Sequence, residues 1–230
     1  MSANLEDEAV AEGQMILSAI AAGLPRTIDA REAICEMQAG GSTQWRQMEW
    51  IGFYPEFWFR DRLAISLDVT DGPKLGNMTF DIKRRFVWDL KAHAEGSSTW
   101  APLNDVEAVR NCITNYDGVG FFAISGSCTY DVDGSFKRWH DELKGGPSAY
   151  ALRNEARGAP SRKRKTSFEP KRLVAFRFSS LDQLDRALSE GWIKGFQKDM
   201  QNSNGVPRRE KIQVDLMRIG KWSIVSEIHV

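Results

Sequence analysis

The stretch of sequence that decides the fold runs from residue 76 to residue 94 and reads GNMTFDIKRRFVWDLKAHA. From Phe86 onward, large apolar side chains alternate with Asp89 and Lys91, so in an extended strand both charged side chains leave the same face. A carboxylate in such a strand is costly to bury without a partner or a metal. A turn at residues 83–85 would bring Asp81 beside them. Together the three side chains predict an oxygen site for a hard divalent cation, with an ammonium group next to it.

The length of that turn determines whether the three groups can meet. A two-residue turn at Arg84-Arg85 pairs Asp81 with Trp88 and points it away from Asp89. A three-residue turn or a bulge places Asp81 on the same face as Asp89 and Lys91. A shared site therefore requires a turn of odd length.

The pattern resembles that of the PD-(D/E)xK nuclease superfamily, in which an acidic residue is followed by Asp or Glu, any residue, and Lys. Asp81, Asp89 and Lys91 match these positions, with Phe80 standing where the family's proline would be. The alternative is an ion pair of Asp89 with Lys91 or Arg84 on the exposed face of a half-solvated antiparallel hairpin.

The order of the predicted elements agrees with the motif. Residues 30–59 have the apolar spacing of one or two helices, and residues 63–69 read as a strand. The hairpin of residues 76–83 and 86–94 is followed by a helix over 102–115, with Asn104 as its N-cap, and by a buried strand over 119–130. The resemblance implies an α/β fold with the αβββαβ core of restriction endonucleases, a central mixed sheet flanked by helices. We expect one nuclease domain over residues 1–230, with the core at 30–130 and a DNA-binding elaboration at 131–230.

The resemblance also implies a function. Asp81, Asp89 and the backbone carbonyl of Leu90 would hold Mg2+, and Lys91 would orient or deprotonate the attacking water and offset charge on the phosphate. Glu49 or Glu56 could add a helix-borne acid. The expected activity is Mg2+-dependent hydrolysis of double-stranded DNA by a type II restriction endonuclease, a homodimer functionally paired with a DNA methyltransferase. The alternatives are a structure-specific or repair nuclease of the same superfamily, and a DNA-binding protein without catalysis.

Basic side chains gather in the second half of the chain. Residues 153–172 read as a mobile basic loop, and residues 197–209 as a polar loop suited to hydrogen-bonding base edges. The expected DNA-binding residues are Arg162, Lys163, Arg164, Lys165, Arg208 and Arg209. A solvated surface run is the alternative. A short helix over 135–143, a strand over 173–178, a helix capped by Ser180 and a hairpin of residues 211–217 and 222–230 complete the chain.

Composition is typical of a folded protein of enzyme size, with 230 residues, 42% apolar content and eight Trp. The formal net charge is zero, yet residues 1–75 carry twelve acidic and six basic side chains, so the basic excess lies later. Three widely spaced cysteines and an acidic N-terminus without a secretory pattern favour the reducing cytoplasm. The apolar stretch at residues 15–24 is too short to span a membrane and predicts a packing helix.

Overall fold

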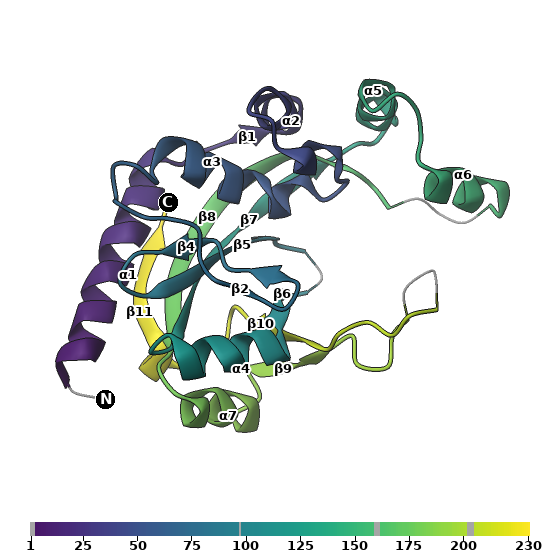
Figure 1. Cartoon of the computed structure of the whole chain (residues 1–230). Coiled ribbons are helices and arrows are strands. Elements are labelled where there is room, and N and C mark those ends of the chain that lie inside the picture. The colour runs from purple at the N-terminus through teal and green to yellow at the C-terminus, as the bar shows by residue number, and fades with distance from the viewer. Residues whose placement is uncertain (1–2, 97, 159–161, 202–204) are drawn as a thin grey trace.

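A computed structural model describes residues 3–96, 98–158, 162–201 and 205–230. The described residues form a six-stranded main sheet in the order β1-β8-β7-β5-β4, with β11 also paired to β8 (Figure 1). Its strands are β1 (Ile28–Asp29), β4 (Ile82–Lys83), β5 (Val87–Ala94), β7 (Val119–Tyr130), β8 (Lys165–Phe178) and β11 (Ile224–His229). β5 and β7 run parallel, and the other pairs in this sheet are antiparallel.

β7 is the most deeply buried strand, since its residues 119–126 are all buried. A continuous apolar run of this kind is expected where both faces of a sheet are covered. The parallel partners β5 and β7 are joined by β6 (Trp100–Asp105) and α4 (Val106–Asn115). Such a crossover is what a parallel pair requires, and the strand predicted over 119–130 is confirmed.

The two faces of the main sheet carry separate hydrophobic cores. One core packs Trp88, Leu90 and Phe122 against α1 (Ala3–Gly23), α2 (Ala30–Ala39) and α3 (Tyr54–Arg62). The other packs Val87 and Phe121 against α4, α7 (Leu181–Ser189) and a small sheet. That sheet has the order β6-β10-β9, with β9 at Ile193–Phe196 and β10 at Lys211–Asp215. The remaining elements are the β2–β3 pair (Lys74–Leu75, Met78–Thr79) and the 3-10 turns η1 (Thr43–Arg46), η2 (Trp50–Gly52) and η3 (Lys221–Ser223).

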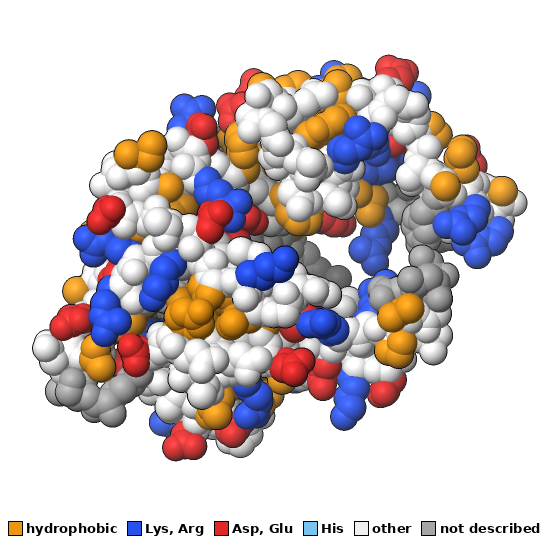
Figure 2. Space-filling view, in the orientation of Figure 1, with side chains coloured by type: hydrophobic (Ala, Val, Ile, Leu, Met, Phe, Trp, Pro, Cys, Tyr) orange, Lys and Arg blue, Asp and Glu red, His pale blue; other side chains and the backbone are white. Residues whose placement is uncertain are grey.

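Two projections give the molecule an open side. Helices α5 (Ser135–Leu143) and α6 (Ala149–Ala156) extend beyond the end of β7, and the segment between β9 and β10 extends below them (Figure 1). Figure 2 shows the surface hollowed between these projections, with Lys and Arg side chains at the edges of the hollow.

Two predicted elements in the first half are wrong. Residues 63–68 are not a strand but a series of turns that continues α3, with Leu67 N–H donating to the Leu63 carbonyl at 3.0 Å. Leu63 and Leu67 pack on the core at helical spacing, while Ile65 between them is 95% exposed. The helix expected from residue 102 begins at Val106, because Asn104 is buried in β6. β6 pairs with β10, which is far away in sequence.

Two more corrections fall in the second half. The predicted loop over 153–172 is divided, since Arg153 lies in α6 and β8 begins at Lys165. Residues 159–161 of that loop lie outside the described part. The expected closing hairpin does not form. β10 pairs with β6 and β9, whereas β11 pairs with β8, so the two strands belong to different sheets. The helices predicted at α5 and α7 are confirmed, the latter with Ser180 as its N-cap.

The fold is thus a mixed α/β structure with a mixed main sheet flanked by helices, as predicted. Two of the six strands of the main sheet in the described residues, β8 and β11, come from the chain after residue 131. Within the described residues, no helix is both long enough and apolar enough to cross a membrane.

Candidate functional site

The turn between β4 and β5 has three residues. Ile82 pairs with Trp88 and Lys83 with Val87, which leaves residues 84–86 as the connection. The turn of odd length is therefore confirmed. When this register is extended by one residue beyond the Ile82–Trp88 pair, Asp81 lies opposite Asp89.

Asp81 contacts the backbone of β5 at Leu90, the residue that follows Asp89. A side-chain oxygen of Asp81, Oδ2, accepts a hydrogen bond of 2.8 Å from the Leu90 N–H. Asp89 is 1% exposed, and its Oδ2 contacts Lys91 Nζ in an ion pair. In the described part of the chain, no other polar group bonds this oxygen. The Lys91 side chain keeps 23% of its surface exposed, so this pair has one side open to solvent.

The alternation predicted for β5 holds. Trp88 and Leu90 point into the core that α1 and α3 cover, whereas Val87 points into the core that α4 covers. Asp89 and Lys91 share the face of Val87 because side chains alternate along a strand. The polar pair thus lies at the border of the second core.

The electrostatics of the site reflect its burial. Desolvation raises the pKa of Asp81 well above its usual range, and the neighbouring Asp89 carboxylate adds to this rise. Burial by itself would lower the pKa of Lys91, but attraction to Asp89 and Asp81 outweighs it and raises that pKa. Lys91 is therefore a stable ammonium at neutral pH, beside an excess of carboxylate.

A third acid reaches the site from α3. Burial raises the pKa of Glu56, with Asp89 adding to the rise, while Arg60 and Lys91 oppose it. Glu56 also forms an ion pair of 3.2 Å with Arg60, one helical turn along α3. The other candidate, Glu49, instead contacts Lys165. The sequence alone could not choose between the two acids, because the choice depends on how α3 packs against β5.

The donor set suits a cation that needs few protein ligands. The described residues contain no group of three or more His, Cys, Asp or Glu side chains already arranged to hold a metal. Mg2+ commonly takes only one or two carboxylates and keeps several waters. Asp81 and Asp89 meet that requirement, and a bound cation would relieve their mutual repulsion. In an extended strand the N–H and C=O of one residue leave on the same edge. The Leu90 carbonyl therefore faces the Asp81 side, as its N–H does.

The predicted DNA-binding residues fall into two groups. Arg164 is 7% exposed and lies 3.8 Å from Asp141, and Lys165 contacts Glu49, so acidic side chains neutralise both. Arg162 and Lys163 are exposed in the segment between α6 and β8. Arg208 and Arg209 are exposed in the segment between β9 and β10, although Arg209 lies 3.9 Å from Asp105. The exposed basic side chains of the predicted set therefore come from these two segments.

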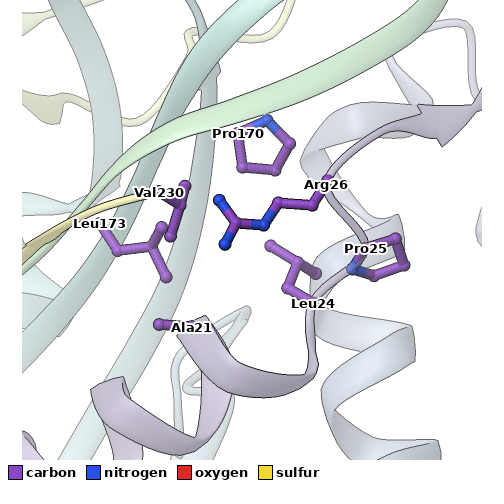
Figure 3. A pocket seen from close by; sticks show the side chains of 7 residues that line it. All are labelled: Ala21, Leu24, Pro25, Arg26, Pro170, Leu173 and Val230. Atoms are coloured by element: carbon purple, nitrogen blue, oxygen red, sulfur yellow. The ribbon is translucent and has the colours of Figure 1, made fainter.

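A pocket elsewhere is too small for a substrate. It lies between the end of α1 and β8, with the Arg26 guanidinium pointing into it (Figure 3). Its volume of about 10 Å³ is near the least that can hold one water molecule. The carboxylate pair on β4 and β5 remains the candidate site.

No protein-family model, no curated protein and no solved structure matches this chain.

Proposed function

We propose that this protein is a Mg2+-dependent endonuclease that hydrolyses phosphodiester bonds of double-stranded DNA. The observation that carries the proposal is the placement of Asp81 opposite Asp89, with Lys91 on the same face as Asp89. Two acids at one sheet edge can hold the ion for metal-assisted phosphodiester hydrolysis, and an ammonium group beside them can offset charge on the phosphate.

In the proposed site, Asp81, Asp89 and the Leu90 carbonyl would hold Mg2+. The bound ion would supply Lewis-acid polarisation of the phosphate and lower the pKa of a water molecule. Glu56 would bind and orient waters at the side of the site that faces α3. In this arrangement Glu56 contributes without being a third carboxylate ligand of the ion.

Lys91 would stabilise negative charge on the phosphate rather than act as a base. Its raised pKa keeps the side chain protonated at neutral pH. A protonated lysine cannot accept a proton from water, but it can offset negative charge that grows on the phosphate oxygens. This assigns Lys91 one of the two roles that the sequence pattern left open.

The family-level part of the proposal is a stand-alone type II restriction endonuclease of the PD-(D/E)xK superfamily, acting as a homodimer beside a partner methyltransferase. The crossover through β6 and α4 between the parallel strands β5 and β7 supports it. A repair or structure-specific nuclease would use the same site. The contact between Lys91 and Asp89 favours a second candidate, a DNA-binding protein in which the two charges serve only as a pair.

A plasmid digest tests the proposal. Supercoiled plasmid is incubated in Mg2+ with the wild type, Asp89→Ala, Lys91→Ala and the control Glu49→Ala, which removes an acid outside the site. We expect each site variant to lose at least about a hundredfold in cleavage rate, with the control unchanged. Discrete bands indicate sequence recognition, and cleavage confined to branched substrates indicates a repair enzyme. DNA binding without cleavage by any protein would refute the nuclease assignment and establish the binding protein.

A further inference from the structure

A buried glutamate from the N-terminal helix holds the turn that sets the site's register. Glu12, on α1, is 5% exposed. Its carboxylate accepts hydrogen bonds of 3.0 Å from the backbone N–H groups of Arg85 and Phe86 and from Trp88 Nε1. Arg84 Nη1 lies 3.9 Å from the same carboxylate. One acid thus contacts all three turn residues and the first large side chain of β5.

The close approach of α1 to β5 makes these bonds possible. At Gly13, the next residue of α1, an added Cβ would lie 2.6 Å from the Trp88 ring. On its other side the Trp88 ring lies over Gly120 of β7 and stacks on Phe122, with ring centroids 4.7 Å apart. Trp88 is therefore confined between helix and sheet, and its indole N–H is fixed toward Glu12.

On the side that faces α1, the turn borders a hollow of about 290 Å³. Charged and apolar residues of α1 line this hollow together with the turn itself. The side chains of Arg84 and Arg85 point to other partners, the Leu67 carbonyl and Asp117. Lys83 Nζ donates a hydrogen bond of 3.0 Å to the Arg85 carbonyl, whereas the Glu12 carboxylate accepts the N–H groups of both Arg85 and Phe86.

We propose that Glu12 is a positioning residue for the candidate site, because it selects the three-residue form of the β4–β5 turn. A turn shorter by one residue would leave an N–H of residues 85–86 without this acceptor and would pair Asp81 with Trp88. By binding both N–H groups, Glu12 keeps Asp81 opposite Asp89. The catalytic consequence rests on the proposed nuclease function, whereas the register itself does not.

Glu12→Gln is the test, since the amide keeps the size of the side chain but presents an NH2 group to one of its donors. Glu8→Gln, one turn earlier on α1 and exposed, is the control for charge. Ile16→Val, also on α1 and fully buried, is the control for lost stability. Amide hydrogen exchange is measured by NMR at Leu90, whose N–H reports the contact with Asp81, and at Phe122 in β7. Cleavage kinetics are measured on the same proteins.

In Glu12→Gln a buried N–H donor that binds Glu12 in the wild type loses its acceptor, which weakens the register of the turn. We therefore expect amide exchange at Leu90, which donates to Asp81 in that register, to accelerate by about tenfold or more relative to Phe122. In Ile16→Val the two amides should accelerate equally, and in Glu8→Gln neither should change. We also expect kcat to fall by about tenfold in Glu12→Gln with KM for DNA unchanged. Equal acceleration of Leu90 and Phe122 in Glu12→Gln would overturn the proposal. If the wild type does not cleave DNA, the nuclease function fails, but the exchange result still decides the role of Glu12.

Discussion

The Asp81 carboxylate accepts a 2.8 Å hydrogen bond from the backbone N–H of Leu90, the residue that follows Asp89 in β5. This bond stabilises the ionised form of Asp81, but it does not offset the effects of burial and of the Asp89 charge. The site therefore holds more negative charge than the fold alone favours. Its acids are expected to trade stability for function.

Asp81→Asn should stabilise the metal-free protein at neutral pH. Because the folded state raises the pKa of Asp81, the contribution of this group is favourable below its unfolded pKa and is lost as pH rises through the folded pKa. At pH 7 the charged form is therefore a cost, and removing it should add about 1–4 kcal/mol to the free energy of unfolding.

Urea unfolding with and without Mg2+ checks this expectation. Excess Mg2+ should stabilise the wild type by about 2–3 kcal/mol at a hundred times the dissociation constant, and Asp81→Asn should not respond. Asp71→Asn is the control, since Asp71 is an exposed acid that pairs with Arg60. This variant should keep the Mg2+ response. A destabilised Asp81→Asn with a normal Mg2+ response would contradict both expectations.

Glu56→Gln should raise the Mg2+ requirement without abolishing cleavage. If Glu56 orients waters beside the ion, its loss should weaken metal affinity by about tenfold to a hundredfold. The measurement is the Mg2+ concentration that gives half-maximal cleavage of plasmid DNA. Glu49→Gln is matched in chemistry and should leave this midpoint unchanged, since Glu49 contacts Lys165 instead. Similar midpoints in the two variants would remove Glu56 from the site.

The local part of the site could be predicted from the sequence. Alternation along a strand placed Asp89 and Lys91 on one face, and the need for a shared site required an odd turn, which residues 84–86 form. Helices and strands with strong local patterns, such as β7 and α5, were predicted with their observed limits. In these cases the signal comes from residues that are neighbours in the chain.

The features that escaped prediction depend on partners far away in sequence. Glu12 binds the N–H of Phe86 across 74 positions, and nothing in the local sequence of α1 marks this acid as different from Glu8. Arg164 and Lys165 read as part of a basic loop because their acidic neighbours, Asp141 and Glu49, come from other elements. Tertiary packing determines these ion pairs, and the pattern of charges along the sequence does not reveal them.

His140 should make the fold sensitive to acid. Burial lowers its pKa to about 4, although the hydrogen bond of its Nε2 to the Trp45 carbonyl opposes the shift. A histidine with a depressed folded pKa binds more protons when unfolded. Its contribution to stability is therefore present above about pH 6.5 and is lost as pH falls toward 4, by roughly 3 kcal/mol.

Urea unfolding at pH 7 and at pH 4.5 measures this loss. His140→Gln keeps a donor for the Trp45 carbonyl and cannot titrate, so it should lose about 2–3 kcal/mol less than the wild type between these pH values. His229→Gln, whose side chain is 73% exposed in the wild type, should follow the wild-type curve. Parallel curves for all three proteins would exclude His140 as the source of the acid response.

Arg208 and Lys165 should differ in their effect on DNA binding, although both were expected to contact DNA. Arg208 is exposed on the segment between β9 and β10, whereas Lys165 is held by Glu49 at the start of β8. Each phosphate contact releases counterions, so Arg208→Ala should weaken binding and reduce the slope of log K against log salt by about 1. Lys165→Met should leave that slope unchanged, because its charge is already neutralised. Both slopes are measured by fluorescence anisotropy with a short duplex in Ca2+ across a salt series. A reduced slope in Lys165→Met would show that Lys165 contacts DNA.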